Sequence, residues 1–137
     1  MAHNFKLWPE LTNNQMQIYY FESPHKQITG PIMAKVVKVT DGDTIRVAWA
    51  ERDFDFPVRM AKLAAPELDE QGGLDSQKFL SNEILGEEVE IIPTKTRVEK
   101  WGRLLANVMF LGMDMSRLSI DTGHAVSWKN REVERWS

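Results

Sequence analysis

The stretch Val-Val-Lys-Val-Thr-Asp-Gly-Asp-Thr-Ile-Arg, residues 36 to 46, joins an alternating pattern to a short acidic turn. Apolar and polar residues alternate on both sides of the turn, which is typical of half-buried β-strands. Asp41-Gly42 between them is a strong hairpin signal, because glycine takes positive φ at low cost. Asp43 and Thr44 add a second carboxylate and a hydroxyl, and two carboxylates on one short loop are what a calcium or magnesium site needs. The stretch therefore predicts either a plain hairpin or a hairpin whose turn binds a cation.

The composition limits the classes of protein that the chain can belong to. Its 137 residues suffice for one domain with a buried core, and the absence of cysteine excludes disulfides and thiolate metal sites. The formal net charge of -3 argues against a broad basic surface, so any recognition of phosphate must be local. No apolar run is long enough to span a membrane, and the first residues lack the pattern of a signal peptide. We therefore expect no membrane contact and a chain that is cytoplasmic as given, or secreted with its signal already removed.

Alternation and turn signals predict five strands, at residues 32–40, 43–50, 54–63, 88–92 and 103–110. Helices are predicted at 75–85 and 115–122, and the mixed-charge tail at 130–136 favours a third. For the first helix, Asp75 is the expected N-cap and Gly86 the stop. Pro57 removes a ladder donor from the third strand, which indicates an edge or a bulge, and residues 94–102 are expected to form a polar loop.

Five short strands with a helix between the third and fourth predict a mainly β (α+β) fold. The best match is a five-stranded Greek-key barrel of the oligonucleotide-binding (OB) type with about three helices. A ferredoxin-like sandwich fits less well, because no helix pattern lies between the first two strands. The barrel domain takes up residues 31–137, and residues 1–30 form an N-terminal extension. Within it, Gln15 to Glu22 is either an additional strand or a segment packed on the barrel.

Four charged residues stand at strand ends or turns: Asp43, Arg59, Glu67 and Arg103. Each alone has an ordinary alternative, such as a paired edge arginine or a solvated loop residue. Together they supply what hydrolysis of a phosphodiester requires. Arginine forks bind phosphate oxygens, a metal polarises the phosphoryl group, and a carboxylate orients or deprotonates the attacking water.

The order of four short motifs resembles the staphylococcal nuclease (thermonuclease) family. The motifs are Asp41-Gly42-Asp43-Thr44, Val58-Arg59-Met60, Ala65-Pro66-Glu67 and Lys100-Trp101-Gly102-Arg103. The resemblance spans roughly residues 32–128 and leaves the N-terminal extension outside it. It implies a five-stranded OB barrel with three helices and calcium-dependent hydrolysis of DNA and RNA.

The resemblance also implies roles for single residues. Asp43 matches the calcium-binding aspartate, and Asp41 matches a nearby acidic position that supports the metal. Arg59 and Arg103 match the two phosphate-binding arginines, and Glu67 matches the general base.

One position departs from the family pattern. Ala64 stands where the family carries a second metal carboxylate, and the backbone carbonyl of the next residue, Ala65, remains as a ligand. Asp69 and Glu70, just past Glu67, are either replacement ligands or part of a solvated acidic loop.

Further contacts with substrate are expected from Lys100 and Trp101. Trp101 stands where the family often has tyrosine, and it either stacks on a base or packs against the barrel. The three histidines, His3, His25 and His124, fit no metal-ligand spacing, and His124 is expected to be a capping or packing residue.

Two functions follow from these residues. The first is a Ca²⁺-dependent endonuclease that hydrolyses DNA and RNA, with single strands preferred. The alternative is an OB-fold module that binds nucleic acid or protein with impaired catalysis, which Ala64 and the acidic net charge favour. Such a module would bind single strands through its few basic residues, among them Lys95, Arg97, Lys100 and Arg103.

Overall fold

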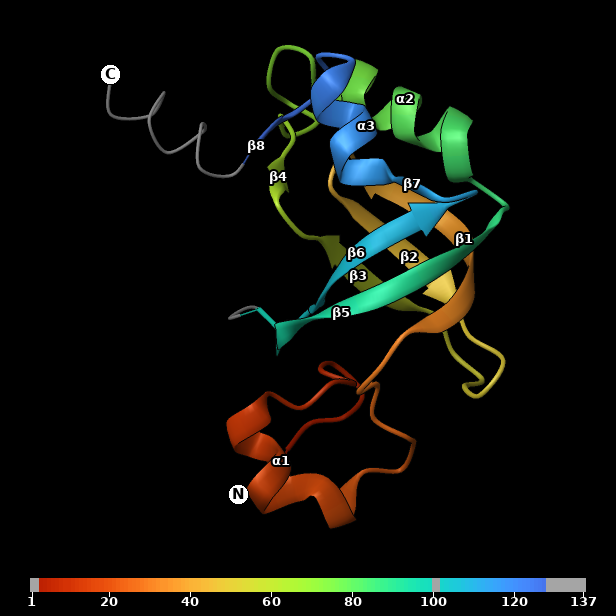
Figure 1. The fold of residues 1–137 in the computed structure, drawn as a ribbon. Helices are drawn as coiled ribbons and strands as arrows, with labels where there is room; N and C mark the ends of the chain where they lie inside the picture. Colours follow the sequence, from red (N-terminus) through yellow and green to blue (C-terminus); the bar gives the residue numbers. More distant parts are fainter. Residues whose placement is uncertain (1–2, 100–101, 128–137) are drawn as a thin grey trace.

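The computed structural model describes residues 3–99 and 102–127, and its centre is a closed barrel of five strands. They are β1 (Ile32–Asp41), β2 (Thr44–Ala48), β3 (Phe56–Met60), β5 (Glu88–Val98) and β6 (Leu104–Phe110). Antiparallel pairs join β3 to β2, β2 to β1, β1 to β5 and β5 to β6, and a parallel pair of β3 with β6 closes the barrel (Figure 1). This confirms the mainly β, OB-type architecture.

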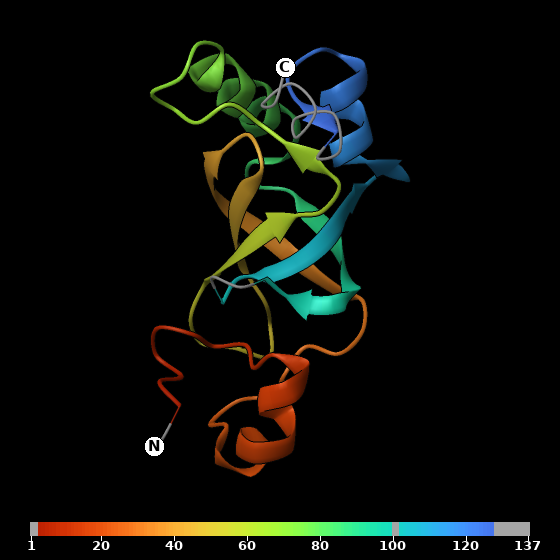
Figure 2. The same ribbon diagram turned by 90° about the vertical axis from the view of Figure 1, so that its left-hand side faces the viewer.

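Short strands and helices cover the two ends of the barrel. The strands are β4 (Leu63–Ala64), which pairs with β8 (Val126–Ser127), and β7 (Met113–Asp114), which pairs with β6. The helices are α1 (Asn13–Tyr19) with the 3₁₀ turn η1 (Tyr20–Glu22), α2 (Gly73–Ile84) and α3 (Met115–Asp121). Figures 1 and 2 show α2 and α3 at one end of the barrel and the N-terminal segment at the other. No helix among the described residues is long and apolar enough to cross a membrane, and the predicted tail helix at 130–136 lies outside these residues.

The alternation along β2 and β3 sorts their side chains into two faces. Ile45 and Val47 on β2, and Val58 and Met60 on β3, are fully buried in the core. The residues between them on β3 are only half-buried and point outward, as does every second residue of β2. The residues of this second face are Thr44, Arg46 and Ala48 on β2, and Pro57 and Arg59 on β3. Among them Thr44 is itself buried, since it is covered by its polar neighbours.

Several predicted boundaries were wrong. β5 continues to Val98 instead of ending at Pro93, because a register shift between these two residues carries the ladder past the proline. The predicted third strand is divided into β3 and β4 by a turn at Lys62, whose φ is 73°. Helix α2 begins after Gly72 rather than Asp75, while Gly86 has the expected positive φ of 82° just past its end.

Within the N-terminal segment, residues 3–30, one of the two alternatives for Gln15 to Glu22, an additional strand, was wrong, because this stretch is helical. Gln15 to Glu22 lies in α1 and η1. Thr12 begins the helix with a capping box, in which its hydroxyl accepts from the Gln15 amide and its own amide donates to the Gln15 side chain, at 3.2 and 3.0 Å. The Thr-x-x-Gln spacing is the sequence signal for this helix. The aromatic run that follows favoured a strand instead, so the helix was missed.

Buried ion pairs join the N-terminal segment to the barrel. Glu10, 3% exposed, pairs with Arg52 and, at 3.7 Å, with Arg97. Arg97 also donates to the carbonyls of Leu11, at 2.6 Å, and Ile28. Arg97 was expected in a polar loop as a contact for nucleic acid, but it is buried and engaged by the N-terminal segment.

Candidate nuclease centre

The β1–β2 hairpin places the acidic turn beside helix α2. Asp41 pairs with Thr44 across the hairpin, so the predicted turn is confirmed. Gly42 does not have a positive φ, and the predicted reason for the glycine was wrong. A Cβ on Gly42 would lie 2.0 Å from Ser76 Oγ on α2 and 2.6 Å from Ala65 Cβ. Close packing against these two residues is therefore what requires a glycine here.

The carboxylate of Asp43 is the centre of a network of contacts. It accepts hydrogen bonds from the Thr44 hydroxyl at 3.0 Å and from the Ala65 amide at 3.2 Å. Its Oδ2 also lies 3.3 Å from Nη2 of Arg59. The Asp43 side chain is only 14% exposed, so these contacts hold it in one position.

Arg59 reaches this carboxylate from β3, where it pairs directly opposite Thr44. Its guanidinium also donates to the carbonyl of Leu63 at 3.0 Å and to that of Met60. These bonds orient the side chain before any ligand is present, at the rim of the barrel.

Arg103 stands directly before β6 and is held by a residue that the sequence did not indicate as functional. Glu99 accepts from its Nε at 2.8 Å and from its Nη2 at 3.1 Å, a bidentate pair. This pairing with Glu99 is the main cause that raises the pKa of Arg103. The remaining nitrogen, Nη1, donates to the Thr44 hydroxyl at 3.3 Å. The four-residue spacing of Glu99 and Arg103 around a glycine turn was the only local signal for the pair.

Asp41 lies beside Asp43 and accepts from its amide at 3.0 Å. Burial raises the pKa of Asp41 to about 6, and a hydrogen bond and repulsion from the Asp43 carboxyl add to the rise. The Asp43 amide and the charge of Arg59 act in the opposite direction. Two carboxyl groups that repel each other in a half-buried turn favour a shared proton or a bound cation.

Glu67 is not brought into this network. It stands on an exposed loop, where its amide donates to the Glu70 carboxylate at 3.0 Å and its carbonyl accepts from the Glu70 amide at 2.9 Å. The Glu67 carboxylate has no hydrogen bond or ion pair with any other described residue. Glu70 thus closes a turn of this loop, and Asp69 is exposed beside it.

The turn offers a divalent cation two carboxylates. Asp41 and Asp43 lie next to each other here, Ala65 contacts Asp43 through its amide, and Ala64 is a buried residue of β4 without a carboxylate. Within the described ranges no group of three His, Cys, Asp or Glu side chains could hold a metal. Since Ca²⁺ takes six to eight oxygens, water or substrate would have to complete its coordination.

Outside the centre, His124 stacks on Phe79 with ring centroids 4.0 Å apart, which confirms its packing role. Lys100 and Trp101 lie outside the described residues. No protein-family model matches this chain, and no curated protein matches it at a significant level. The geometry around Asp43 therefore carries the functional argument.

Proposed function

We propose that this chain is a metal-dependent nuclease that hydrolyses phosphodiester bonds of DNA and RNA, with Ca²⁺ as its metal and single strands as preferred substrates. The observation that carries the proposal is the convergence of two arginines, one on β3 and one directly before β6, on one acidic turn. Arg59 pairs with Asp43, and Arg103 donates to the hydroxyl of Thr44, which itself donates to Asp43. A phosphate placed here meets two guanidinium groups at once.

In this proposal the arginines exchange protein partners for the substrate. Arg59 turns from Asp43, and Arg103 from Glu99, to bind the phosphate oxygens and the charge that develops on them. Glu67 is the proposed base that orients or deprotonates water. Its exposed loop must then approach the phosphate when substrate binds, and catalytic hydrogen bonds commonly tighten only in such a complex.

Asp41, Asp43 and the Ala65 carbonyl are the proposed ligands of the cation. When bound, it would polarise the phosphoryl group. Loss of a carboxylate at Ala64 costs on the order of 2 to 4 kcal/mol, which corresponds to a roughly 30- to 1000-fold weaker site. We therefore expect activity only at high calcium.

The test is cleavage of single-stranded DNA and RNA across a calcium series with a chelator control. Arg59→Ala should slow cleavage by about 100-fold or more, because it removes a phosphate ligand. Arg117→Ala is the matched control, since Arg117 is exposed on α3 and pairs only with Asp121 among the described residues. Glu67→Ala should also slow cleavage, whereas Asp69→Ala on the same loop should not. Parent-like cleavage by Arg59→Ala would contradict the proposed site.

A second function, binding of single strands without efficient hydrolysis, is favoured by two observations. Ala64 supplies no metal ligand, and the Glu67 carboxylate contacts no group of the centre. A folded parent that binds single-stranded DNA but does not cut it at high calcium would support this function over the first. Arg103→Ala would then weaken binding by several-fold.

A further inference from the structure

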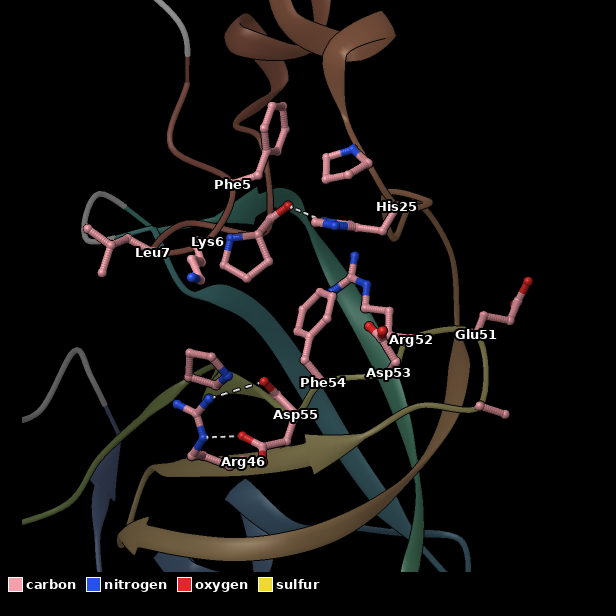
Figure 3. A pocket seen from close by; sticks show the side chains of 14 residues that line it. Phe5, Lys6, Leu7, His25, Arg46, Glu51, Arg52, Asp53, Phe54 and Asp55 are labelled. Carbon is pink, nitrogen blue, oxygen red and sulfur yellow. Dashed lines mark hydrogen bonds and ion pairs between the residues drawn. The ribbon is translucent and has the colours of Figure 1, made fainter.

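A groove of about 1170 Å³ lies between the N-terminal segment and the barrel. One wall comes from the segment and includes Phe5, Lys6 and Leu7, and the other comes from β2, β3 and the loop between them, including Arg46, Phe54 and Pro57. Figure 3 shows Lys6 extending toward the ion pair of Arg46 with Asp55, and Phe54 rising from the loop toward His25. The volume is ample for a nucleoside.

This groove continues the outward face that carries the candidate centre. On β2 and β3 the pair Thr44–Arg59 belongs to the centre, and the next outward pair, Arg46–Pro57, lines the groove. Two residues along a strand correspond to roughly 7 Å. Arg103 also lies on this side, because the residue after it, Leu104, pairs with Val58. If the two arginines hold one phosphate of a nucleic acid strand, the nucleotide next to that phosphate is therefore close enough to enter the groove.

Trp8 seats the N-terminal segment on the turn that carries Arg103. A Cβ on Gly102 would lie 2.2 Å from the Trp8 ring, so the ring packs directly on this glycine. Leu7, the next residue, lines the groove and is 67% exposed. The wall contributed by the segment is thus held in place relative to Arg103.

The chemistry of the groove suits a base better than a phosphate. Its charged groups are of both signs, and Arg46 is already bonded to Asp55 at 2.6 Å. Ring and proline surfaces offer flat apolar contacts, while Lys6 and the carboxylates can meet polar base edges. Arg52 lies behind this lining, fully buried, with its guanidinium 4.6 Å from the centre of the Phe56 ring and 5.6 Å from that of Phe54. It therefore supports the wall of the groove rather than offering a contact to a ligand.

We propose that the groove binds the base of the nucleotide next to the phosphate held by Arg59 and Arg103, so that the N-terminal segment helps to bind single-stranded nucleic acid. The inference rests on the phosphate-binding part of the proposed function and does not depend on hydrolysis. Continuity with the two arginines favours a nucleotide over a protein segment as the occupant.

The test compares a short single-stranded DNA with a strand of equal length made of abasic residues. Binding is measured by fluorescence anisotropy in chelator, so that no cleavage occurs. The parent should bind the normal strand about 10-fold more tightly, because base stacking adds to the contacts with phosphate. Leu7→Glu should lose most of this preference, since a carboxylate then occupies the exposed rim of the groove.

Ile18→Glu is the matched control, because Ile18 is 71% exposed on α1 and does not line the groove. It should bind both strands as the parent does, and an unchanged thermal midpoint in both variants would show that the fold is kept.

Equal binding of the two strands by the parent, or parent-like binding by Leu7→Glu, would overturn the inference and leave the groove to another occupant, such as a protein segment. Failure of the parent to bind either strand would overturn the groove and the phosphate site together. Tighter binding of the normal strand than of the abasic strand, without cleavage at any calcium concentration, would support the groove as a base site and contradict only the proposed hydrolysis.

Discussion

Asp41 and Asp43 are separated by one glycine but have different surroundings. Asp43 faces Arg59 and accepts two further hydrogen bonds, whereas burial and the neighbouring Asp43 raise the pKa of Asp41 from 3.8 to about 6. A carboxyl with a raised pKa binds its proton more tightly in the folded state. Its contribution to stability is therefore complete below pH 3.8 and is lost as the pH rises through 6.

Asp41→Asn should accordingly stabilise the protein at pH 7 in chelator. The asparagine keeps the size of the side chain without the charge, and we expect a gain of about 1 to 2 kcal/mol after allowing for solvent screening. At pH 3.5 the gain should vanish, because the parent Asp41 is then protonated in both states. Urea unfolding at the two pH values measures it, with Asp53→Asn, at an exposed loop position, as the control. A variant less stable than the parent at pH 7 would show that the charge of Asp41 supports the fold.

Ala64→Asp tests the missing metal ligand. The side chain at this position is 3% exposed, so an aspartate there should lower the free energy of unfolding without metal. Calcium should restore stability and bind roughly 30-fold or more tightly than in the parent. Titration calorimetry and the thermal midpoint at increasing calcium measure both effects, and Ala64→Asn separates charge from size. If calcium affected parent and variant alike, the cation would have to bind elsewhere or not at all.

At the level of single elements, the contact between α2 and the β1–β2 hairpin depends on Gly42. Because a Cβ at this position would collide with Ser76 and Ala65, the hairpin and the helix could not keep their present separation. The same contact sets the position of Asp43, whose carboxylate accepts from the Ala65 amide.

Gly42→Ala should therefore destabilise the protein by about 1 to 3 kcal/mol through overpacking. Gly30→Ala is the matched control, because no atom lies within 4 Å of a Cβ at that position, and this substitution should be neutral or slightly stabilising. Urea unfolding of both variants distinguishes them. Equal stability of Gly42→Ala and parent would mean that α2 shifts freely relative to the hairpin.

For the whole molecule, the N-terminal segment is an integral part of the packed structure. Its Glu10 forms ion pairs with two arginines of the barrel, Arg52 and Arg97, which are both buried. The chain therefore cannot lose this segment without leaving cations unpaired in a region of low dielectric constant.

Glu10→Ala should cost about 3 to 5 kcal/mol, because it leaves these charges without their carboxylate. Glu22→Ala, at an exposed acid of the same segment, should change stability by less than about 0.5 kcal/mol. Thermal and urea unfolding of the two variants provide the comparison. A stable Glu10→Ala variant would indicate that water reaches the two arginines and that the segment packs only loosely.

Short-range patterns in the sequence were enough to specify the strands, the hairpin and the outward direction of Arg59. Strand alternation has a period of two residues and is set by the local backbone, so a run of a few residues encodes which face each side chain takes. The order of Asp43, Arg59 and Arg103 suggested a common site only through a resemblance to a family. The resemblance also placed Glu67 in this site, but in the structure its carboxylate makes no contact with Asp43, Arg59 or Arg103.

Only the tertiary structure decided which charged residues meet. Arg103 and Thr44 are 59 positions apart and touch because β3 pairs with β6 to close the barrel. Arg97, which local polarity placed in a solvated loop, is buried because Glu10 and the carbonyl of Leu11, 86 positions away, cover it. Gly42 was correctly predicted to be a turn residue. The reason that no side chain fits there, however, is a helix that begins more than thirty residues later in the chain. Such contacts depend on barrel closure and on packing between distant elements, and no local pattern of residues encodes either.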